Sequence, residues 1–269
     1  PSAFLDLVKA FDRVDHDRLL YKLFKMGVKG KLYSFIRSFL LIRSARTTTL
    51  NYSHFSDSYV FKSGVPQGSV LGPILFLVYI NDLLYQISFH TRCIPLAFAD
   101  DLCIIPNIDI NHYKNSHGHL SKQNIEKYNE ECKRQLQLAL DFCTVWADNW
   151  RMKFSFTKSN IIMFTSSPTY PTPSFPVFNL NSQPLEYTRH YSYLGLTFTF
   201  NLKWEEHSNR LIQKCSIMAY LINRLINNES DINVILKLVN ATTKAAISYA
   251  LPFWSPSPTT FNKLNSLLI

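Results

Sequence analysis

Hydrophobic residues change their spacing within the first forty positions of the chain. Residues 4–8 form a short, mostly apolar run that predicts a buried β-strand. Apolar residues then recur every three or four positions, which predicts a helix capped by Asp15 or Asp17 and ended by Gly27. A second helix is predicted over residues 31–41. Its expected apolar face holds Leu32, Phe35, Ile36 and Phe39.

The segment after these helices combines strand-like sequence with turn residues. Residues 46–51 and 58–62 are rich in Thr, Tyr and Val, which predicts two strands. The sequence GVPQGSVLGP then starts at Gly64 and leads into a helix with Pro73 in its first turn. Proline is favoured there because the first turn of a helix does not use its backbone N–H groups.

Two apolar segments, residues 94–99 and 102–105, flank Asp100-Asp101 and predict a β-hairpin with the two aspartates at its tip. Beyond them, apolar residues at helical spacing predict one long amphipathic helix over about residues 121–150.

The last third of the chain begins with two predicted strands, residues 152–156 and 161–165. The proline-rich segment 168–176 follows and is the best candidate for a domain boundary. A hairpin around Tyr193-Leu194-Gly195 and helices over residues 205–226 and 232–249 complete the pattern. We therefore expect an α+β fold, in which an antiparallel sheet with helices on one face precedes a mostly helical region.

The charge of the chain is distributed unevenly. The net charge is +9, and residues 1–50 carry ten Lys and Arg against four Asp and Glu. Residues 51–110 carry two against five, so an acidic segment follows a basic one. Residues 151–228 are basic again. A basic protein with one acidic segment is typical of a polyanion-binding protein that holds cations at its centre.

Five cysteines, an odd number without a CxxC pair, favour neither a disulfide framework nor a zinc site. We expect small buried side chains in a reducing, intracellular compartment, and no disulfide-linked partner. His112, His117 and His119 lie in a polar stretch that is typical of a solvated loop. No run approaches the roughly 18 apolar residues of a membrane span, so no membrane partner is expected. The apolar run 74–80 predicts a buried helix.

Asp100-Asp101 is the first feature that indicates chemistry. A two-residue hairpin turn favours Asn-Gly or Asp-Gly, because positive φ is easiest for those residues. Two adjacent aspartates add charge repulsion to that strain, and a divalent cation would compensate for both. Taken alone, the pair is more simply interpreted as a solvated acidic turn.

Asp6 changes that interpretation because it lies in the middle of a predicted apolar strand. A carboxylate between Leu5 and Leu7 is costly unless it is paired or binds a metal. Together with Asp100 and Asp101 it forms a carboxylate set able to hold two Mg²⁺ ions. Nucleotidyl transfer uses two such ions, one at the attacking 3′-hydroxyl and one at the leaving pyrophosphate.

Three segments, in order, resemble a known family: FLDLVKAFD from Phe4, GVPQGSVLGPILFLVYINDL from Gly64, and LAFADDLCII from Leu96. They are similar to motifs A, B and C of reverse transcriptases. The long form of motif B resembles the non-LTR retrotransposons of the jockey-like group, and differs from group II intron maturases and retroviral enzymes. Residues 146–164 resemble motif D, and Tyr193-Leu194-Gly195 resembles motif E.

The resemblance implies a role for individual residues. Asp6, Asp100 and Asp101 would be the catalytic, metal-binding carboxylates, and Phe11 would lie under the sugar of the incoming nucleotide. Because Asp6 and Phe11 have opposite parity on a strand, the chain must leave the strand near Lys9 for both to face one pocket. Phe11 as a hydrophobic anchor for the following helix remains an alternative.

Gln67 and Gly68 match the residues that approach the nucleotide and template, although Gly64 and Gly68 are also explained as ordinary turn glycines. Lys158 resembles the motif D lysine that protonates pyrophosphate, or is an exposed lysine at a strand end. Tyr193, Leu194 and Gly195 match the primer grip, or form a simple hairpin.

The resemblance further implies a polymerase palm with partial fingers over residues 1–200 and an incomplete thumb over residues 201–269. The expected activity is RNA-directed DNA synthesis within a retrotransposon polyprotein, in the nucleus and cytoplasm. It would use an RNA template, a DNA primer, dNTPs and two Mg²⁺ ions, with Mn²⁺ able to substitute.

The family's finger motifs and an upstream endonuclease would precede Pro1, so the chain is expected to be a fragment that binds nucleic acid but incorporates nucleotides poorly. The rival hypothesis is an inactive transposon remnant that only binds nucleic acid.

Overall fold

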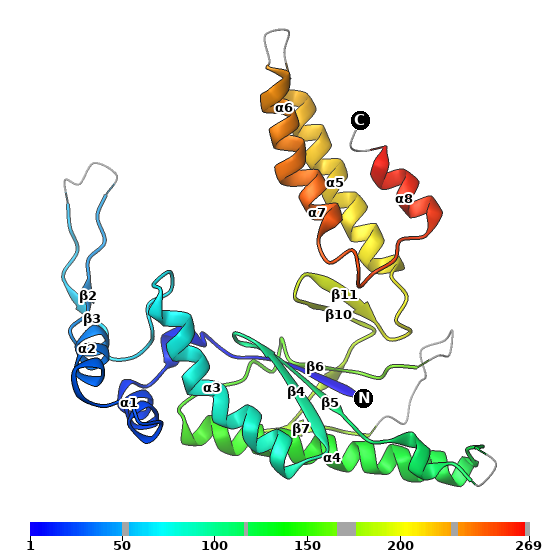
Figure 1. Cartoon of the computed structure of the whole chain (residues 1–269), viewed down its shortest axis with the longest axis horizontal. Helices are drawn as coiled ribbons and strands as arrows, with labels where there is room; N and C mark the ends of the chain where they lie inside the picture. The colour runs from blue at the N-terminus through cyan, green and yellow to red at the C-terminus, as the bar shows by residue number, and fades with distance from the viewer. Residues whose placement is uncertain (50–53, 116–117, 166–175, 227–230, 267–269) are drawn as a thin grey trace. The chain divides into compact units, whose positions relative to one another are not determined.

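The computed structural model describes residues 1–49, 54–115, 118–165, 176–226 and 231–266 (Figure 1). Its contacts divide the chain into two compact units. The first comprises Pro1–Met163 and Thr172–Thr188, and the second comprises Phe164–Pro171 and Arg189–Ile269. Apart from Pro176, the proline-rich segment predicted as the domain boundary lies outside the described residues.

A five-stranded sheet forms the centre of the first unit, in the order β4-β5-β1-β6-β9. All neighbouring strands are antiparallel except β6 and β9. The α+β prediction is therefore confirmed, and the predicted first strand is the middle strand of the sheet. The strands are β1 (Ser2–Asp6), β4 (Cys93–Phe98), β5 (Asp101–Pro106), β6 (Asn160–Ile162) and β9 (Glu186–Tyr187).

One face of this sheet packs into the hydrophobic core, and the other face carries two aspartates. Ala3 and Leu5 of β1 pair with Ile104 and Leu102 of β5, and all four join one hydrophobic core. That core also contains the buried residues of α3 (Leu71–His90) and α4 (Lys122–Asn149), which lie beside β4 and β5 in Figure 1. Because side chains alternate along a strand, β1 and β5 direct their two aspartates to the opposite face.

Helix α3 is hydrophobic around much of its circumference. By length and composition alone it is the one helix, among the described residues, that is both long and apolar enough to cross a membrane. The core helix of a soluble protein passes the same test, and Leu75, Phe76 and Tyr79 of α3 are almost fully buried. The predicted buried stretch is nevertheless only partly buried, because Ile74 and Leu77 are exposed.

Helix α1 (His16–Lys25) begins and ends as its sequence predicts. The carboxylate of Asp15 accepts a hydrogen bond from the Arg18 N–H at 3.0 Å, and Gly27 adopts a φ of +90°. The predicted apolar face of helix α2 (Gly30–Leu41) is only partly confirmed, because Ile36 is buried and Phe39 packs against the core. Ile36 and Leu40 are its buried residues, whereas Leu32 and Phe35 are more than half exposed.

A buried lysine joins α1 to α3 and α4. The ammonium of Lys22 lies 2.5 Å from the Asp82 carboxylate and 3.6 Å from the centre of the Trp150 ring. Trp146 donates its indole N–H to the same carboxylate at 2.9 Å. Burial lowers the pKa of Lys22 to about 8, and the hydrogen bond to Asp82 opposes that shift. The three helices are thus tied together by one charged cluster.

The remaining paired segments of the first unit are short. β2 (Ser44–Ala45) pairs with β3 (Tyr59–Val60), and Thr48 forms an isolated bridge with Phe55, so the two predicted strands form a narrow ribbon. β7 (Asn179–Leu180) pairs with β8 (Gln183–Pro184). The predicted strand 152–156 is reduced to a single bridge between Phe154 and Leu7.

The second unit consists of a hairpin and helices. Leu196 of the hairpin packs with Leu211, Cys215 and Trp254 in a separate hydrophobic core. The hairpin therefore packs with the helices of the second unit, while the predicted palm extends to residue 200 and includes it. The elements are β10 (His190–Tyr193), β11 (Leu196–Thr199), α5 (Glu205–Leu225), α6 (Ile232–Val239), the π-helical turn η3 (Asn240–Lys244), α7 (Ala245–Ser248) and α8 (Pro258–Asn265).

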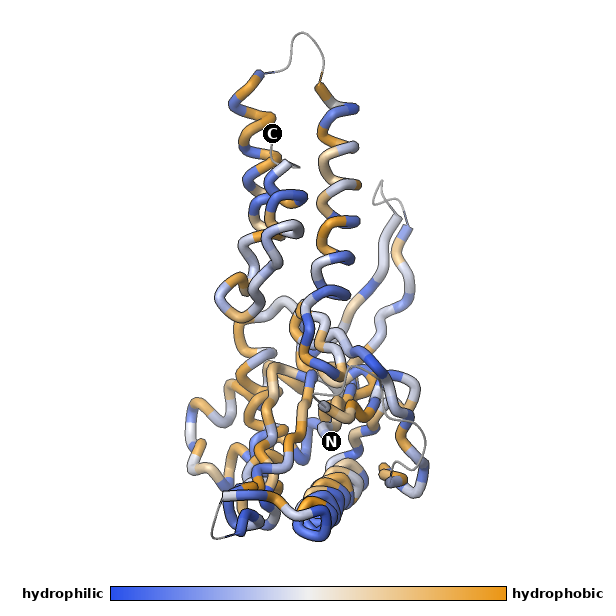
Figure 2. The backbone as a smooth tube through the Cα atoms, turned by 90° about the vertical axis from the view of Figure 1, so that its right-hand side faces the viewer, coloured by the Kyte–Doolittle hydropathy of each residue, from blue (hydrophilic) through white to orange (hydrophobic). Residues whose placement is uncertain are grey.

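Helices α5 and α6 have amphipathic sequences. Figure 2 shows hydrophobic and hydrophilic residues interleaved along both of them. The predicted helix 232–249 is continuous from α6 through η3 to α7, but its middle turn has π geometry. Helix α8 was not predicted, although Ser257 caps it and Pro258 starts it.

Candidate active site

The chain leaves the central strand immediately after Asp6. Leu7 still forms a bridge to Phe154, and the Val8 N–H donates to the Lys153 carbonyl at 2.8 Å. Lys9 then adopts a φ of +49°, and the short 3₁₀ helix η1 (Phe11–Arg13) follows. The change of direction at Lys9 is the one that Asp6 and Phe11 require in order to face one pocket.

The hairpin between β4 and β5 turns one residue earlier than predicted. Phe98 pairs with Asp101, so the two turn residues are Ala99 and Asp100. The positive φ, +53°, falls on Ala99. The expectation that both aspartates form the turn is therefore wrong. Because Asp101 is the first residue of β5, it is held in the sheet by its pairing with Phe98 and with β1.

Asp6 and Asp101 are direct cross-strand partners at one end of the sheet. Such partners share a face, with Cβ atoms about 5 Å apart, and like charges there repel. The pKa of Asp101 is raised, first by burial and then by the charges of Asp100 and Asp6, while Lys158 acts in the opposite direction. These four charged groups therefore form one electrostatic cluster.

Lys158 lies in a turn packed beside the end of β1. Its ammonium is 3.6 Å from the Asp6 carboxylate, and its side chain is 68% exposed, against 21% for Asp6. The Ser155 N–H donates to the Asp6 carbonyl at 2.8 Å, and the Asp6 N–H donates to the hydroxyl of the fully buried Ser159 at 3.2 Å. This turn thus fixes both the backbone of Asp6 and the position of the lysine.

The three carboxylates suit a magnesium ion in chemistry but are not arranged around one. Carboxylate oxygens are hard ligands of the kind that Mg²⁺ prefers. In the parts of the chain that the structure describes, however, no group of three or more His, Cys, Asp or Glu side chains is close enough to hold a metal. The backbone brings Asp6, Asp100 and Asp101 together, and convergence on an ion would require their side chains to rotate.

The loop at the start of motif B is bound to the segment that carries Phe11. The Gly64 N–H donates to the Val14 carbonyl at 2.7 Å, and the Val65 N–H donates to the Phe11 carbonyl at 2.8 Å. The Gly64 carbonyl is contacted by His16 Nε2 at 2.8 Å and accepts from Arg43 at 3.0 Å. A side chain at Gly64 would lie 2.9 Å from the backbone of Asp12.

Gly64 and Gly68 form a matched pair for a stability test. Both have positive φ, +89° and +81°, but a Cβ at Gly68 would have no neighbour within 4 Å. Alanine at either position should cost about 1 kcal/mol of backbone strain, and at Gly64 about 1–3 kcal/mol more from the collision. We expect urea denaturation to show the larger loss for Gly64→Ala. Equal losses in the two variants would contradict the close approach of the two loops.

The predicted nucleotide-binding residues lie on these two joined segments. The ring of Phe11 is half-buried and stacks on Phe76 of α3, with centroids 4.7 Å apart. Gln67 is exposed, and its side-chain amide lies 3.5 Å from the Asp12 carboxylate. Gly68 is also exposed. The stacking keeps both interpretations of Phe11 open, because a partly buried ring can support a helix and also face a ligand.

Tyr193, Leu194 and Gly195 form the end and turn of the β10–β11 hairpin, so the predicted hairpin is confirmed. Leu194 and Gly195 both have positive φ, +49° and +78°. These residues belong to the second unit. Their predicted contact with a primer remains a prediction.

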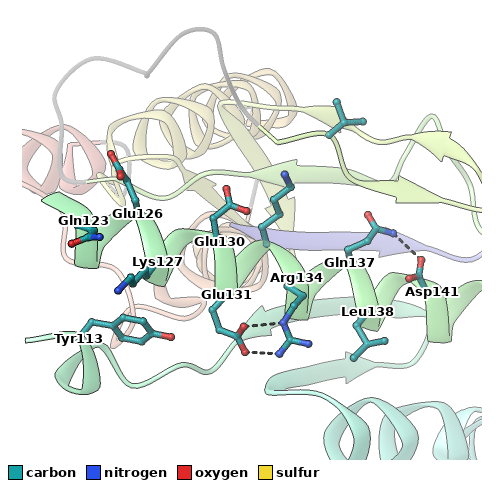
Figure 3. Close-up of a pocket in the computed structure, with 12 residues that line it drawn as sticks. Tyr113, Gln123, Glu126, Lys127, Glu130, Glu131, Arg134, Gln137, Leu138 and Asp141 are labelled. Carbon is teal, nitrogen blue, oxygen red and sulfur yellow. Dashed lines mark hydrogen bonds and ion pairs between the residues drawn. The ribbon is translucent and has the colours of Figure 1, made fainter.

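A large hollow in the first unit is not part of this site. It has a volume of about 970 Å³ and lies on α4, where its lining includes none of the predicted site residues. Figure 3 shows Glu131 and Arg134 pointing toward each other, joined by an ion pair of 2.7 Å, and Gln137 toward Asp141. The surface carries charges of both signs, and its strongest contact is the ion pair between Glu131 and Arg134.

Comparison with known proteins identifies the family. A family model described as "Reverse transcriptase (RNA-dependent DNA polymerase)" matches residues 2–198, which is more than half of the 269 residues. The chain belongs to the reverse transcriptase family. The matched region contains Asp6, Asp100 and Asp101, and it runs through the β10–β11 hairpin.

The relatives of this reverse transcriptase domain include polymerases of mobile elements. It is 32% identical over 225 residues to the RNA-directed DNA polymerase from mobile element jockey of Drosophila melanogaster, covering 82% of this chain and 22% of the relative. It is 26% identical over 273 residues to the jockey polymerase of Drosophila funebris, covering 99% and 27%. The jockey-like resemblance is confirmed, and the chain spans about a quarter of these relatives or less.

Among solved structures, the reverse transcriptase domain is similar to apo telomerase from Candida tropicalis. The TM-score is 0.45 at 13% identity, over 99% of this chain and 44% of the telomerase. Reverse transcriptases as a family generally depend on divalent metal ions.

Some residues that shape the reverse transcriptase site were missed by sequence reasoning. Arg43 and His16 converge on the Gly64 carbonyl, and Ser159 supports Asp6. Arg43 and His16 lie outside the quoted motifs, and Ser159 lies within the motif D resemblance, next to Lys158. Gly72 did have a signal, since it belongs to the VLGP of motif B. A Cβ there would collide with the carbonyl oxygen of Pro66, so this glycine permits the tight start of α3.

Proposed function

We propose that this chain catalyses RNA-directed DNA synthesis, in which a primer 3′-hydroxyl attacks the α-phosphate of a dNTP. The observation that carries the proposal is the pairing of Asp6 with Asp101 next to Asp100, in a chain of the reverse transcriptase family. Three carboxylates at the end of two paired strands match what two-metal nucleotidyl transfer needs. The relatives' names support the same activity.

The proposed cofactor is a pair of Mg²⁺ ions, with Mn²⁺ able to substitute. Asp6 and Asp100 would be the principal ligands and Asp101 the third. When bound, the ions would activate the 3′-hydroxyl and neutralise charge on the departing pyrophosphate. The pKa of Asp101 is raised first by burial and then by the charges of Asp100 and Asp6, and a cation at this site would balance those charges.

The other predicted residues would position the substrates. Phe11 would lie under the deoxyribose, and Gln67 and Gly68 would contact the nucleotide and template. Lys158, 3.6 Å from Asp6, is close enough to the carboxylates to protonate pyrophosphate as general acid. Tyr193, Leu194 and Gly195 would hold the primer end.

The proposed partners are an RNA template and a DNA primer, held mainly through their backbones. The basic first fifty residues and the basic 151–228 region support this, because phosphate contacts are made by Lys and Arg. We place this activity inside the cell, in the cytoplasm and nucleus, as part of a retrotransposon polyprotein.

Salt dependence of binding tests the proposed partner. We expect residues 1–269 to bind an RNA–DNA duplex with an affinity that falls roughly ten- to thousandfold between ~50 and ~200 mM salt, because bound phosphates release counterions. Fluorescence anisotropy measures this. Asp100→Asn, which removes negative charge without touching the basic regions, should bind at least as tightly as the wild type. Salt-independent binding would contradict backbone recognition.

Primer extension tests the proposed reaction. A polymerase that contains this chain should extend a DNA primer on an RNA template with dNTPs and Mg²⁺, and should fail without the metal. Binding without extension under all metal conditions would support the rival hypothesis of an inactive remnant.

A further inference from the structure

The turn of the β10–β11 hairpin adopts a conformation that its sequence does not favour. Leu194 has a φ of +49° and Gly195 a φ of +78°, so both lie in the left-handed region. Two-residue turns of this kind favour Asn-Gly, because leucine pays a steric cost there. A strained turn persists only where surrounding contacts hold it, and such strain is frequent at functional sites.

Tyr249, at the end of α7, supplies contacts to both turn residues. Its hydroxyl donates a hydrogen bond to the Leu194 carbonyl at 2.8 Å. Its ring lies against Gly195, where an added Cβ would stand only 3.1 Å from the tyrosine Cε1. A side chain at the second turn position would therefore be strained by the positive φ and crowded by this ring.

Tyr249 is itself anchored to the core of the second unit. Its backbone carbonyl accepts a hydrogen bond from the indole N–H of Trp254 at 3.2 Å. Trp254 has no exposed surface and belongs to the hydrophobic core that contains Leu196 of β11. A continuous path of two hydrogen bonds thus links the buried core to the tip of the hairpin.

The planar peptide bond between Leu194 and Gly195 couples the direction of its carbonyl to that of its N–H group. The carbonyl of Leu194 and the N–H of Gly195 belong to one peptide unit and point in opposite directions. By holding the carbonyl, the Tyr249 hydroxyl also sets the direction of the Gly195 N–H, which is aimed away from the tyrosine. A backbone N–H held in a fixed direction is a donor suited to a phosphate oxygen.

We infer that Tyr249 is a positioning residue that orients the Leu194–Gly195 peptide so that the Gly195 N–H binds a phosphate of the primer strand. This inference rests on the proposed primer contact of the hairpin. What it adds to that contact is Tyr249, a residue outside motifs A to E that holds the turn in position.

The test is equilibrium binding of a primed RNA–DNA duplex to residues 1–269, with Tyr249→Phe as the variant. Removing one hydrogen bond should weaken binding roughly three- to tenfold without changing the melting temperature. Tyr220→Phe is the matched control, because Tyr220 is similarly exposed (60% against 54%) but lies on α5. It should bind as the wild type does.

A neutral methylphosphonate, moved one linkage at a time through the last few positions of the primer, locates the phosphate. Wild type should lose affinity at one linkage, and Tyr249→Phe should show little further loss there, because the two changes remove the same contact. An undiminished loss in Tyr249→Phe, or no sensitive linkage in the wild type, would overturn the inference. A separate failure of the polymerase to extend primers would instead count against the proposed reaction.

Discussion

Asp100→Asn is expected to lower polymerisation by at least about 100-fold while leaving the fold intact, because it removes a charge proposed to bind metal and almost no volume. The assay is single-turnover primer extension by a polymerase that contains this chain. Asp100 lies in the hairpin turn next to Asp101, the cross-strand partner of Asp6. Activity above a few per cent of wild type would contradict the assignment of Asp100 as a metal ligand.

Two measurements on the same variant separate a lost ligand from a damaged fold. The charge of Asp100 helps to raise the pKa of Asp101, so Asp100→Asn should lower that pKa in an NMR titration. A carboxyl whose pKa is raised on folding makes the protein less stable as pH rises from its unfolded pKa, about 3.9, through its folded value. Relief of the repulsion should therefore leave the variant as stable as wild type at neutral pH, or slightly more stable.

Phe11→Ala or Phe11→Val is expected to raise ribonucleotide use far more than it lowers deoxynucleotide use. If the ring lies beneath the sugar, it occupies the space that a 2′-hydroxyl needs, and exclusion is steric. The competing interpretation makes Phe11 an anchor on Phe76, on which it stacks at 4.7 Å. Truncation of a fully buried phenylalanine costs on the order of 3–5 kcal/mol, and less for a half-buried one.

The two interpretations of Phe11 predict different combinations of rates and stability. Incorporation rates for both nucleotide types are measured together with the melting temperature. Phe76→Leu is the matched control, because it removes the stacking partner, which is 1% exposed, and leaves Phe11 in place. It should lower stability without changing sugar selection. An unchanged ratio of the two rates in a destabilised Phe11→Ala would show that Phe11 is an anchor and that another residue selects the sugar.

Helix ends and the long helix were predictable because nearby residues in the sequence determine them. Asp15 caps α1, Gly27 ends it, and apolar spacing marks the long helix α4. The resemblance grouped Asp6, Asp100 and Asp101, and the structure pairs Asp6 with Asp101 across neighbouring strands.

The predictions failed where contacts between distant parts of the chain determine which residues are buried or where a turn lies. The local sequence does not indicate that Leu32 and Phe35 of α2 are exposed while Leu40 is buried, since all three are similarly hydrophobic. The hairpin turns at Ala99 because Asp101 is held by its strand partners, although an aspartate fits positive φ more easily. The β10–β11 hairpin joins the second unit through the burial of Leu196, which its sequence does not specify.

Iron-mediated backbone cleavage tests the central claim, that Asp6, Asp100 and Asp101 form the metal site of this reverse transcriptase. Fe²⁺ replaces Mg²⁺ in residues 1–269 bound to a primed RNA–DNA duplex, and the hydroxyl radicals that it generates cut the chain beside the ion. We expect cuts near Asp6 and near Asp100-Asp101, suppressed by excess Mg²⁺ and lost in Asp6→Asn. Cuts confined to other parts of the chain, or the same cuts in Asp6→Asn, would contradict the account.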